Sequence, residues 1–280
     1  MRALSSDEVA AAFRAACRAE LQALKPGNVH VFAAGHGMET AQFERAADAA
    51  APAIARTALP VGARVLAAVE ASLAAAGCNT NLGILLLCAP LAAAAQMDGT
   101  DDLSTRLTGV LDGLDRTDAD AAFRAIAAAS PGGLGAATEA DVHKPAQVTL
   151  GAAMALAAAR DSIARQYTTG FADIFALGVP PLAAEPTARG PVEEAYLAFL
   201  ATLPDSHIAR KFGSETAERV RTEAEALRRT LPGLGPNERH DALLAFDAAL
   251  KARGLNPGTS ADLTVASIFA ALMLSATTGR

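Results

Sequence analysis

The sequence predicts an all-α protein in which many helices form a single-domain bundle around one buried central helix, at about residues 82–95. Hydrophobic residues make up 51% of the 280-residue chain, but only 4% are aromatic, and alanine is very abundant. Valine, isoleucine and threonine do not form the alternating runs that are typical of β-strands. This composition favours helices that pack closely through small side chains.

The predicted central helix contains no charged side chain from Leu82 to Ala95. A helix that is apolar all round has no face for solvent, so other helices must surround it. It is shorter than the roughly 20 residues that cross a bilayer, which indicates a core helix rather than a membrane span. Pro90 is expected to bend or interrupt it.

A small polar group, Asn79-Thr80-Asn81, precedes this helix. Asn79 or Thr80 can cap the exposed N–H groups of the first helical turn. A helix N-terminus also attracts anions, so the same group can line the bottom of an anion-binding cleft. The residues alone leave both interpretations open.

The helices before and after this one are predicted from periodicity, caps and breakers. The first begins after Ser5 or Ser6, buries Val9, Phe13 and Cys17, and ends at the Pro-Gly of residues 26–27. The others are expected at residues 40–57, 63–76, 103–111, 118–129, 148–175, 192–203, 214–230 and 236–253, followed by an apolar helix that ends near residue 274. Residues 178–191 hold four prolines and are the best candidate for a hinge.

Composition also bounds the partners of the protein. The formal net charge of −6 argues against a general nucleic-acid binder but allows a phosphorylated small molecule, because local cations or a divalent ion can reverse the field in a cleft. Cys17, Cys78 and Cys88 lack metal-binding spacing, and the N-terminus lacks a signal peptide. We expect reduced thiols, a cytoplasmic location and no membrane partner. A homodimer is left open.

Polar residues gather in four other loops. The loop at residues 25–38 contains Lys25 and His36, which are interpreted either as ligand contacts or as a helix-end cation and a surface histidine. Glu139, Asp141 and His143 alternate along a polar run, where a loop can bring them together on a metal or a leaving group. No strand precedes the glycine loop at residues 130–135, so a dinucleotide fold is not supported.

The other two polar loops lie near the C-terminus. Residues 205–213 hold an acid, a hydroxyl group, a histidine and two cations, and residues 255–263 form a second polar group that opens an apolar helix. Asp262 lies in the first turn of that helix, where a carboxylate either complements the dipole or ligates a divalent ion. Asp161 and Arg165 have the spacing of an ordinary surface ion pair.

Taken together and in this order, these segments resemble the triphosphoribosyl-dephospho-CoA synthase family from about residue 20 to residue 274. The matching segments are KPG with Gly35-His36, GCNTNLG at residues 77–83, residues 133–141, DSHIAR at residues 205–210 and NPGTSADL at residues 256–263. The chain departs from the family where Asn81-Leu82 replaces a His-Lys pair and where Lys211-Phe212 displaces a glycine. The segments KPGNV and ARQY resemble those of a divergent branch of this family that is found in archaea and methylotrophic bacteria.

The resemblance implies an all-α transferase that uses ATP. The C1′–adenine bond of ATP breaks, and the triphosphoribosyl group passes to a hydroxyl of 3′-dephospho-CoA through a transition state like an oxocarbenium ion. The divergent branch suggests a second acceptor, in ribosyl or phosphoribosyl transfer for tetrahydromethanopterin biosynthesis. A non-catalytic nucleotide-binding helical protein is the alternative from another class.

The resemblance also suggests roles for individual residues. Asp205 and Asp262 are expected to hold Mg²⁺ for the ATP substrate. Phosphate contacts are expected from Lys25, Arg210 and Lys211, with Asn79 and Thr80 orienting a phosphate or the ribose. Glu139 or Asp141 is the expected base, and His36 is a weaker candidate acid. The remaining expected substrate-binding residues are Asn28, Ser206, Gly258 and Ser260.

Overall fold

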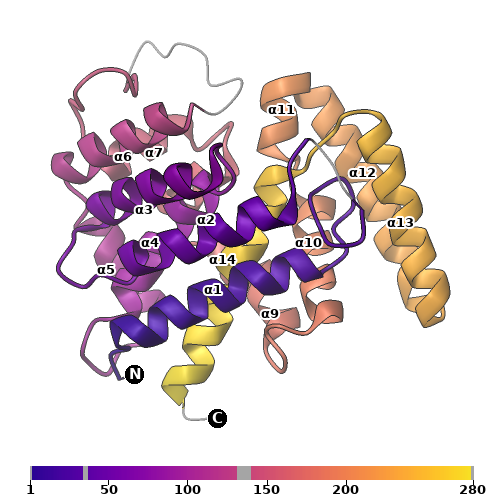
Figure 1. Ribbon diagram of the computed structural model, residues 1–280, viewed down its shortest axis with the longest axis horizontal. Coiled ribbons are helices and arrows are strands. Elements are labelled where there is room, and N and C mark those ends of the chain that lie inside the picture. The colour runs from indigo at the N-terminus through magenta and orange to yellow at the C-terminus, as the bar shows by residue number, and fades with distance from the viewer. Residues whose placement is uncertain (1, 34–36, 131–139, 279–280) are drawn as a thin grey trace.

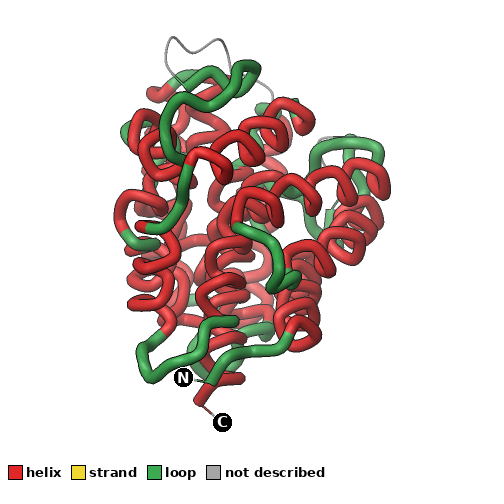
Figure 2. The backbone as a smooth tube through the Cα atoms, turned by 90° about the vertical axis from the view of Figure 1, so that its left-hand side faces the viewer, coloured by secondary structure: helices red, strands yellow, loops and turns green. Residues whose placement is uncertain are grey.

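The computed structural model describes residues 2–33, 37–130 and 140–278, and within them every regular element is a helix (Figures 1 and 2). The helices are α1 (Ser6–Gln22), α2 (Thr40–Ile54), α3 (Val61–Ala76), α4 (Leu82–Ala95), α5 (Leu103–Asp112), α6 (Arg116–Ala129), α7 (Leu150–Ala157), α8 (Ser162–Thr169), the π-helical turn η1 (Ile174–Gly178), α9 (Val179–Leu182), α10 (Arg189–Thr202), α11 (Ser206–Phe212), α12 (Ser214–Thr230), the 3₁₀ turn η2 (Leu231–Gly233), α13 (Pro236–Ala252) and α14 (Gly258–Thr278). The predicted all-α fold class is confirmed.

Two helices, rather than the one expected, occupy the centre of the molecule. Every side chain of α4 except Ala93 is buried, and α4 packs against α3, α5 and α14. Helix α14 runs through the middle of Figure 1 and packs against α1, α4 and α10. It is long and apolar enough to cross a membrane, but 72% of its most apolar window is buried inside the protein.

A second apolar cluster lies beside this core, on the side of α10, α12 and α13. Its buried members include Tyr196, Leu197, Val220 and Leu243, and Leu24 joins it from the loop after α1. In Figure 1 these helices stand on the right of α14, whereas α2 to α7 stand on the left. Helix α14 therefore separates two groups of helices, and its N-terminal end faces both of them.

The start of α1 follows the cap that the sequence predicts. The Ser5 hydroxyl accepts a hydrogen bond from the Glu8 amide at 3.3 Å, and the Glu8 carboxylate accepts one from the Ser5 amide at 2.9 Å. Asp102 caps α5 in the same way, through the Thr105 amide. The predicted long helix at 148–175 is wrong, because it is divided into α7, α8 and η1.

Asp161 explains the break between α7 and α8. Its side chain accepts hydrogen bonds from the amides of Ile163 at 2.9 Å and Ala164 at 3.2 Å, so it begins a new helix as an N-cap. The predicted Asp161–Arg165 surface pair is also wrong, because Arg165 pairs with Asp173 at 2.5 Å. The segment from Ile174 to Leu182 is helical, and a hinge at residues 178–191 stays a prediction.

Pro90 does not interrupt α4, which is continuous from Leu82 to Ala95, and a bend at Pro90 stays a prediction. Proline has no N–H group, so the Leu86 carbonyl one turn earlier loses its helical donor. The buried hydroxyl of Tyr167 in α8 donates to that carbonyl at 2.6 Å. A side chain from a neighbouring helix thus replaces the missing backbone hydrogen bond.

We expect Tyr167→Phe to lower the free energy of unfolding by about 1–3 kcal/mol, because the buried Leu86 carbonyl then has no donor. In a Pro90→Ala background residue 90 supplies its own N–H group, so the same change is expected to cost less. A double-mutant cycle measured by urea unfolding checks this coupling. An equal cost in both backgrounds would contradict the account.

Candidate functional site

A cleft of about 610 Å³ opens between α7 and α11, which stand on either side of it at the top of Figure 1. The N-terminal turns of α4 and α14 form its floor, and the loop after α1 contributes Asn28. Of the predicted site residues, those that line this cleft are Asn28, Asn79, Thr80, Asp141, Arg210, Lys211, Gly258 and Asp262. Segments far apart in the sequence therefore meet at one place.

The geometry at the start of α4 is consistent with both interpretations of its polar group, helix capping and anion binding. The Asn79 side chain accepts a hydrogen bond from the Leu82 amide at 3.2 Å, which is a capping contact. The Thr80 hydroxyl is buried on the cleft side without a hydrogen-bond partner in the described part of the chain. Asn81 instead donates to Ser72 of α3 at 3.1 Å and fixes the loop to its neighbour.

Asp262 lies on the floor, with its carboxylate against the backbone of α4. A Cβ atom added to Gly83 would come 2.1 Å from Oδ2 of Asp262, so only glycine leaves room for the carboxylate there. Burial, together with the negative charges of Asp205 and Glu20, raises the pKa of Asp262 well above its ordinary value. Arg210 acts in the opposite direction. The floor is therefore a place where a positive charge is favoured.

We expect Gly83→Ala to lower kcat about 100-fold, because the new methyl group displaces the Asp262 carboxylate by more than an ångström. Alanine is the better helix former by about 1 kcal/mol, which offsets part of the steric cost to stability. Gly109→Ala in the exposed part of α5 is the matched control, since nothing lies within 4 Å of its added Cβ. Steady-state kinetics check both variants, and an active Gly83→Ala enzyme would contradict this placement.

Lys25 lies behind the cleft wall, fully buried. Its ammonium group pairs with the Glu20 carboxylate and donates to Asn28 Oδ1 at 3.0 Å and to the Val29 carbonyl at 2.8 Å. An ammonium group has three N–H donors, so these partners use all of them. This geometry favours a positioning role for Lys25 over the predicted phosphate contact.

The loop that carries Lys25 is held from several sides. The Tyr196 hydroxyl donates to the Pro26 carbonyl at 2.7 Å, and the Gly27 amide donates to Asp247 at 2.8 Å. Asn28 then donates to Asn256 at 2.8 Å, which links this loop to the start of α14. The first and the last of the sequence motifs are thus joined, and Asn28 is fixed at the cleft surface.

Asp205, Ser206 and Ser260 also lie behind the cleft. Oδ1 of Asp205 accepts from the amides of His207 at 2.9 Å and Ile208 at 3.1 Å, and Oδ2 accepts from the Ser260 amide and hydroxyl at 2.8 and 2.9 Å. Ser206 accepts from the Ser162 amide at 2.8 Å. These contacts fasten the starts of α8, α11 and α14 together. Because both oxygens of Asp205 are occupied, the geometry favours a structural role over the predicted metal contact.

The cleft wall and mouth hold the remaining polar groups. Asp141 lines the wall and accepts from the His143 amide at 3.0 Å. Arg210 of α11 reaches across to Asp161 at 3.3 Å, and Lys211 is exposed at the rim. The two other predicted catalytic residues, His36 and Glu139, lie outside the described residues.

The donor set fits a Mg²⁺ ion that arrives with a nucleotide. Among the described residues, no three His, Cys, Asp or Glu side chains form a group that could hold a metal ion by themselves. Mg²⁺ commonly binds through one or two carboxylates together with substrate phosphates and water. Asp262 supplies one such carboxylate on the floor, and the part of the cleft that the structure describes offers no complete set of protein ligands that would replace the phosphates and water.

Sequence reasoning missed three charged side chains that line the cleft. These are Glu20, Arg160 and Asp161. An N-cap interpretation of Asp161, an aspartate directly before a helix-forming segment, would have placed it at a helix start facing its neighbours. Glu20 carries no comparable signal, because a glutamate near a helix end is ordinary. Arg160 follows α7 in a turn, where exposed arginines are common.

Comparison with known proteins confirms the resemblance. Residues 6–279 match the family model described as ATP:dephospho-CoA triphosphoribosyl transferase, CitG. The chain is also similar to a crystal structure from Archaeoglobus fulgidus that is described as a triphosphoribosyl-dephospho-CoA synthase. The two chains share 27% identity over 82% of this chain and 97% of that chain, with a TM-score of 0.65. No curated protein matches. The chain therefore belongs to the ATP:dephospho-CoA triphosphoribosyl transferase family and is a transferase.

Proposed function

We propose that the cleft is the site at which the triphosphoribosyl group of ATP passes to a hydroxyl of dephospho-CoA. The observation that supports this most directly is the Asp262 carboxylate on a floor made by two helix N-termini, with Arg210 beside it. Helix N-termini bind phosphate oxygens through their free N–H groups. In this proposal the triphosphate lies on the floor and the ribose points toward the wall.

Asp262 would hold the Mg²⁺ that accompanies ATP. When bound, Mg²⁺ neutralises part of the triphosphate charge. Asp262 and Glu20 make the floor acidic, so free ATP, with its negative charge, is expected to bind weakly there. Thr80 and Asn79 contribute their side chains at the α4 terminus, and Arg210 contributes a charge-assisted hydrogen bond to a phosphate oxygen.

The transfer step breaks the bond between C1′ and N9 of adenine and forms a bond between C1′ and the acceptor oxygen. A carboxylate base accepts the proton of the acceptor hydroxyl, and adenine takes up a proton as it departs. Asp141 on the wall is proposed as the base, with Glu139 as the neighbouring candidate. Positive charge that develops at C1′ is stabilised by the same carboxylates.

Purified protein incubated with Mg-ATP and dephospho-CoA tests this function. Chromatography is expected to show free adenine, and mass spectrometry a dephospho-CoA product enlarged by the triphosphoribosyl group. Adenine and product are expected in equal amounts. Nucleotide binding without adenine release in the presence of dephospho-CoA would contradict the proposal. The comparisons support neither of the alternatives considered from the sequence, a pterin-pathway acceptor and a non-catalytic binding protein.

We also propose a cytoplasmic location, because ATP and a coenzyme precursor are the substrates. The expected absence of nucleic-acid and membrane partners, and the homodimer, stay predictions.

A further inference from the structure

The mouth of the cleft carries large apolar side chains that are unusually exposed. Leu156 at the end of α7 and Phe212 at the end of α11 are each 45% exposed, and both line the cleft. In the described part of the chain, the other large apolar residues with comparable exposure are Val31, Phe32 and Met97, and none of these lines it. Apolar surface at a cleft mouth marks a place where a ligand covers it.

Each of these apolar residues shares its wall of the cleft with a cation. The Arg160 guanidinium donates to the Leu156 carbonyl at 3.3 Å, so this cation lies beside Leu156 on the α7 wall. Lys211 directly precedes Phe212 on the α11 wall, is exposed and also lines the cleft. The two walls thus present the same combination, one apolar side chain with one cation.

This combination matches a nucleotide rather than a purely apolar ligand. A purine base offers a flat apolar face that stacks on an aromatic ring, and a pyrophosphate offers negative charge to arginine and lysine. In contrast, Arg210 deeper in the cleft is paired with Asp161. The charge at the mouth is therefore complementary to a diphosphate held close to a base.

We propose that Leu156, Arg160, Lys211 and Phe212 form a subsite for the adenosine diphosphate part of the acceptor, with the purine against Phe212. This inference rests on the proposed function, in which the floor holds the triphosphate of ATP. With the floor occupied by the donor, the bulk of the acceptor lies at the mouth. Lys211 would then contact the acceptor, rather than the ATP phosphates that the sequence suggested.

Calorimetric binding of dephospho-CoA tests the subsite without requiring turnover. We expect Phe212→Ala and the double variant Arg160→Met, Lys211→Met each to raise the Kd for dephospho-CoA about 10-fold. The Kd for Mg-ATP is expected to change less than about 2-fold, because the floor is untouched. ADP is expected to compete with dephospho-CoA for the wild-type protein, whereas pantetheine is not.

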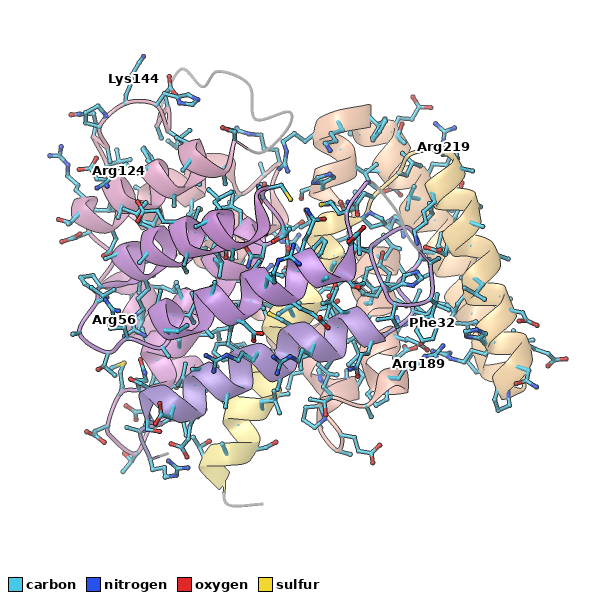
Figure 3. All side chains as sticks on the ribbon, in the orientation of Figure 1. Phe32, Arg56, Arg124, Lys144, Arg189 and Arg219 are labelled. Atoms are coloured by element: carbon cyan, nitrogen blue, oxygen red, sulfur yellow. The ribbon has the colours of Figure 1, made fainter. Side chains whose placement is uncertain are left out.

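Phe32→Ala is the matched control. Phe32 is an exposed phenylalanine that also stands beside an arginine, with the Arg189 guanidinium carbon 4.2 Å from its ring centre, but it lies away from the cleft (Figure 3). Its loss is expected to leave the Kd for dephospho-CoA unchanged. An unchanged Kd in the Phe212 variant, or an equal loss of Mg-ATP binding, would overturn the subsite. So would a wild-type protein that does not bind dephospho-CoA.

Failure of the proposed function gives a different result. In that case dephospho-CoA binds at the mouth and responds to Phe212→Ala, but no adenine is released when Mg-ATP is added. Binding and turnover thus report separately on the subsite and on the reaction.

Discussion

Replacing Asp262 by asparagine is expected to lower kcat/KM for ATP about 1,000-fold, without lowering the free energy of unfolding. The carboxylate lies on a buried floor near Asp205 and Glu20, where a negative charge is unfavourable until a cation arrives. Asparagine keeps the shape and removes that charge. The variant therefore loses the group that would hold the metal–nucleotide complex. In the empty protein, the loss of the favourable Arg210 interaction is offset by relief from burial and from the repulsion of Asp205 and Glu20.

A second consequence separates a metal-binding role from a structural one. In the wild-type protein, ATP binding is expected to depend strongly on Mg²⁺, whereas in Asp262→Asn it is expected to become nearly independent of Mg²⁺. Calorimetry with Mg²⁺ or with a chelator measures this difference. Asp205→Asn is the matched control, because its amide would face the Ser260 donors and lower stability while the Mg²⁺ dependence is retained. Wild-type turnover in Asp262→Asn would contradict the assignment.

Replacing Lys25 by methionine is expected to lower the free energy of unfolding by about 3–5 kcal/mol, because the buried Glu20 carboxylate then loses its ionic partner. The hydrogen bonds to Asn28 and the Val29 carbonyl are lost as well. Urea unfolding measures the loss. The double variant Glu20→Gln, Lys25→Met is expected to recover most of it, since no uncompensated charge is left inside.

Kinetics on the same variants distinguish the two roles of Lys25. If Lys25 serves only the buried network, and the Asn256 contact keeps Asn28 in place, the double variant is expected to keep a KM for ATP within about 3-fold of the wild-type value. If instead Lys25 holds a phosphate, the single variant stays as stable as the wild type and its KM for ATP rises strongly. The second pattern would contradict the buried network.

The fold was predictable to the extent that it depends on local pattern. The uncharged run of α4 required burial on all sides, and the caps at Ser5 and Asp102 fixed helix starts through contacts within one turn. The break at Asp161 was missed because the sequence pattern on both sides of it is typical of one long helix. The continuity of α4 through Pro90 was not predictable, because its compensating donor, Tyr167, comes from another helix.

The sequence predicted which residues belong to the candidate site better than it predicted their roles. Motifs spread over the chain supplied Asn79, Asp141, Arg210 and Asp262, and the fold brings them to one cleft. Sequence shows that Lys25 and Asp205 are charged, but it does not show which donors and acceptors surround them. One donor to Asp205 lies on another helix, and the ammonium group of Lys25 points inward within its own loop. Only the packed structure therefore reveals that their hydrogen-bonding capacity is already used.

The most direct measurement is a crystal structure of the protein with Mg-ATP. The triphosphate is expected at the N-termini of α4 and α14, with the metal ion between it and Asp262, and C1′ facing Asp141. Phe212 and Leu156 are expected to remain uncovered by the donor. A triphosphate bound at the mouth between Arg160 and Lys211, or ATP bound outside the cleft, would contradict the proposed arrangement.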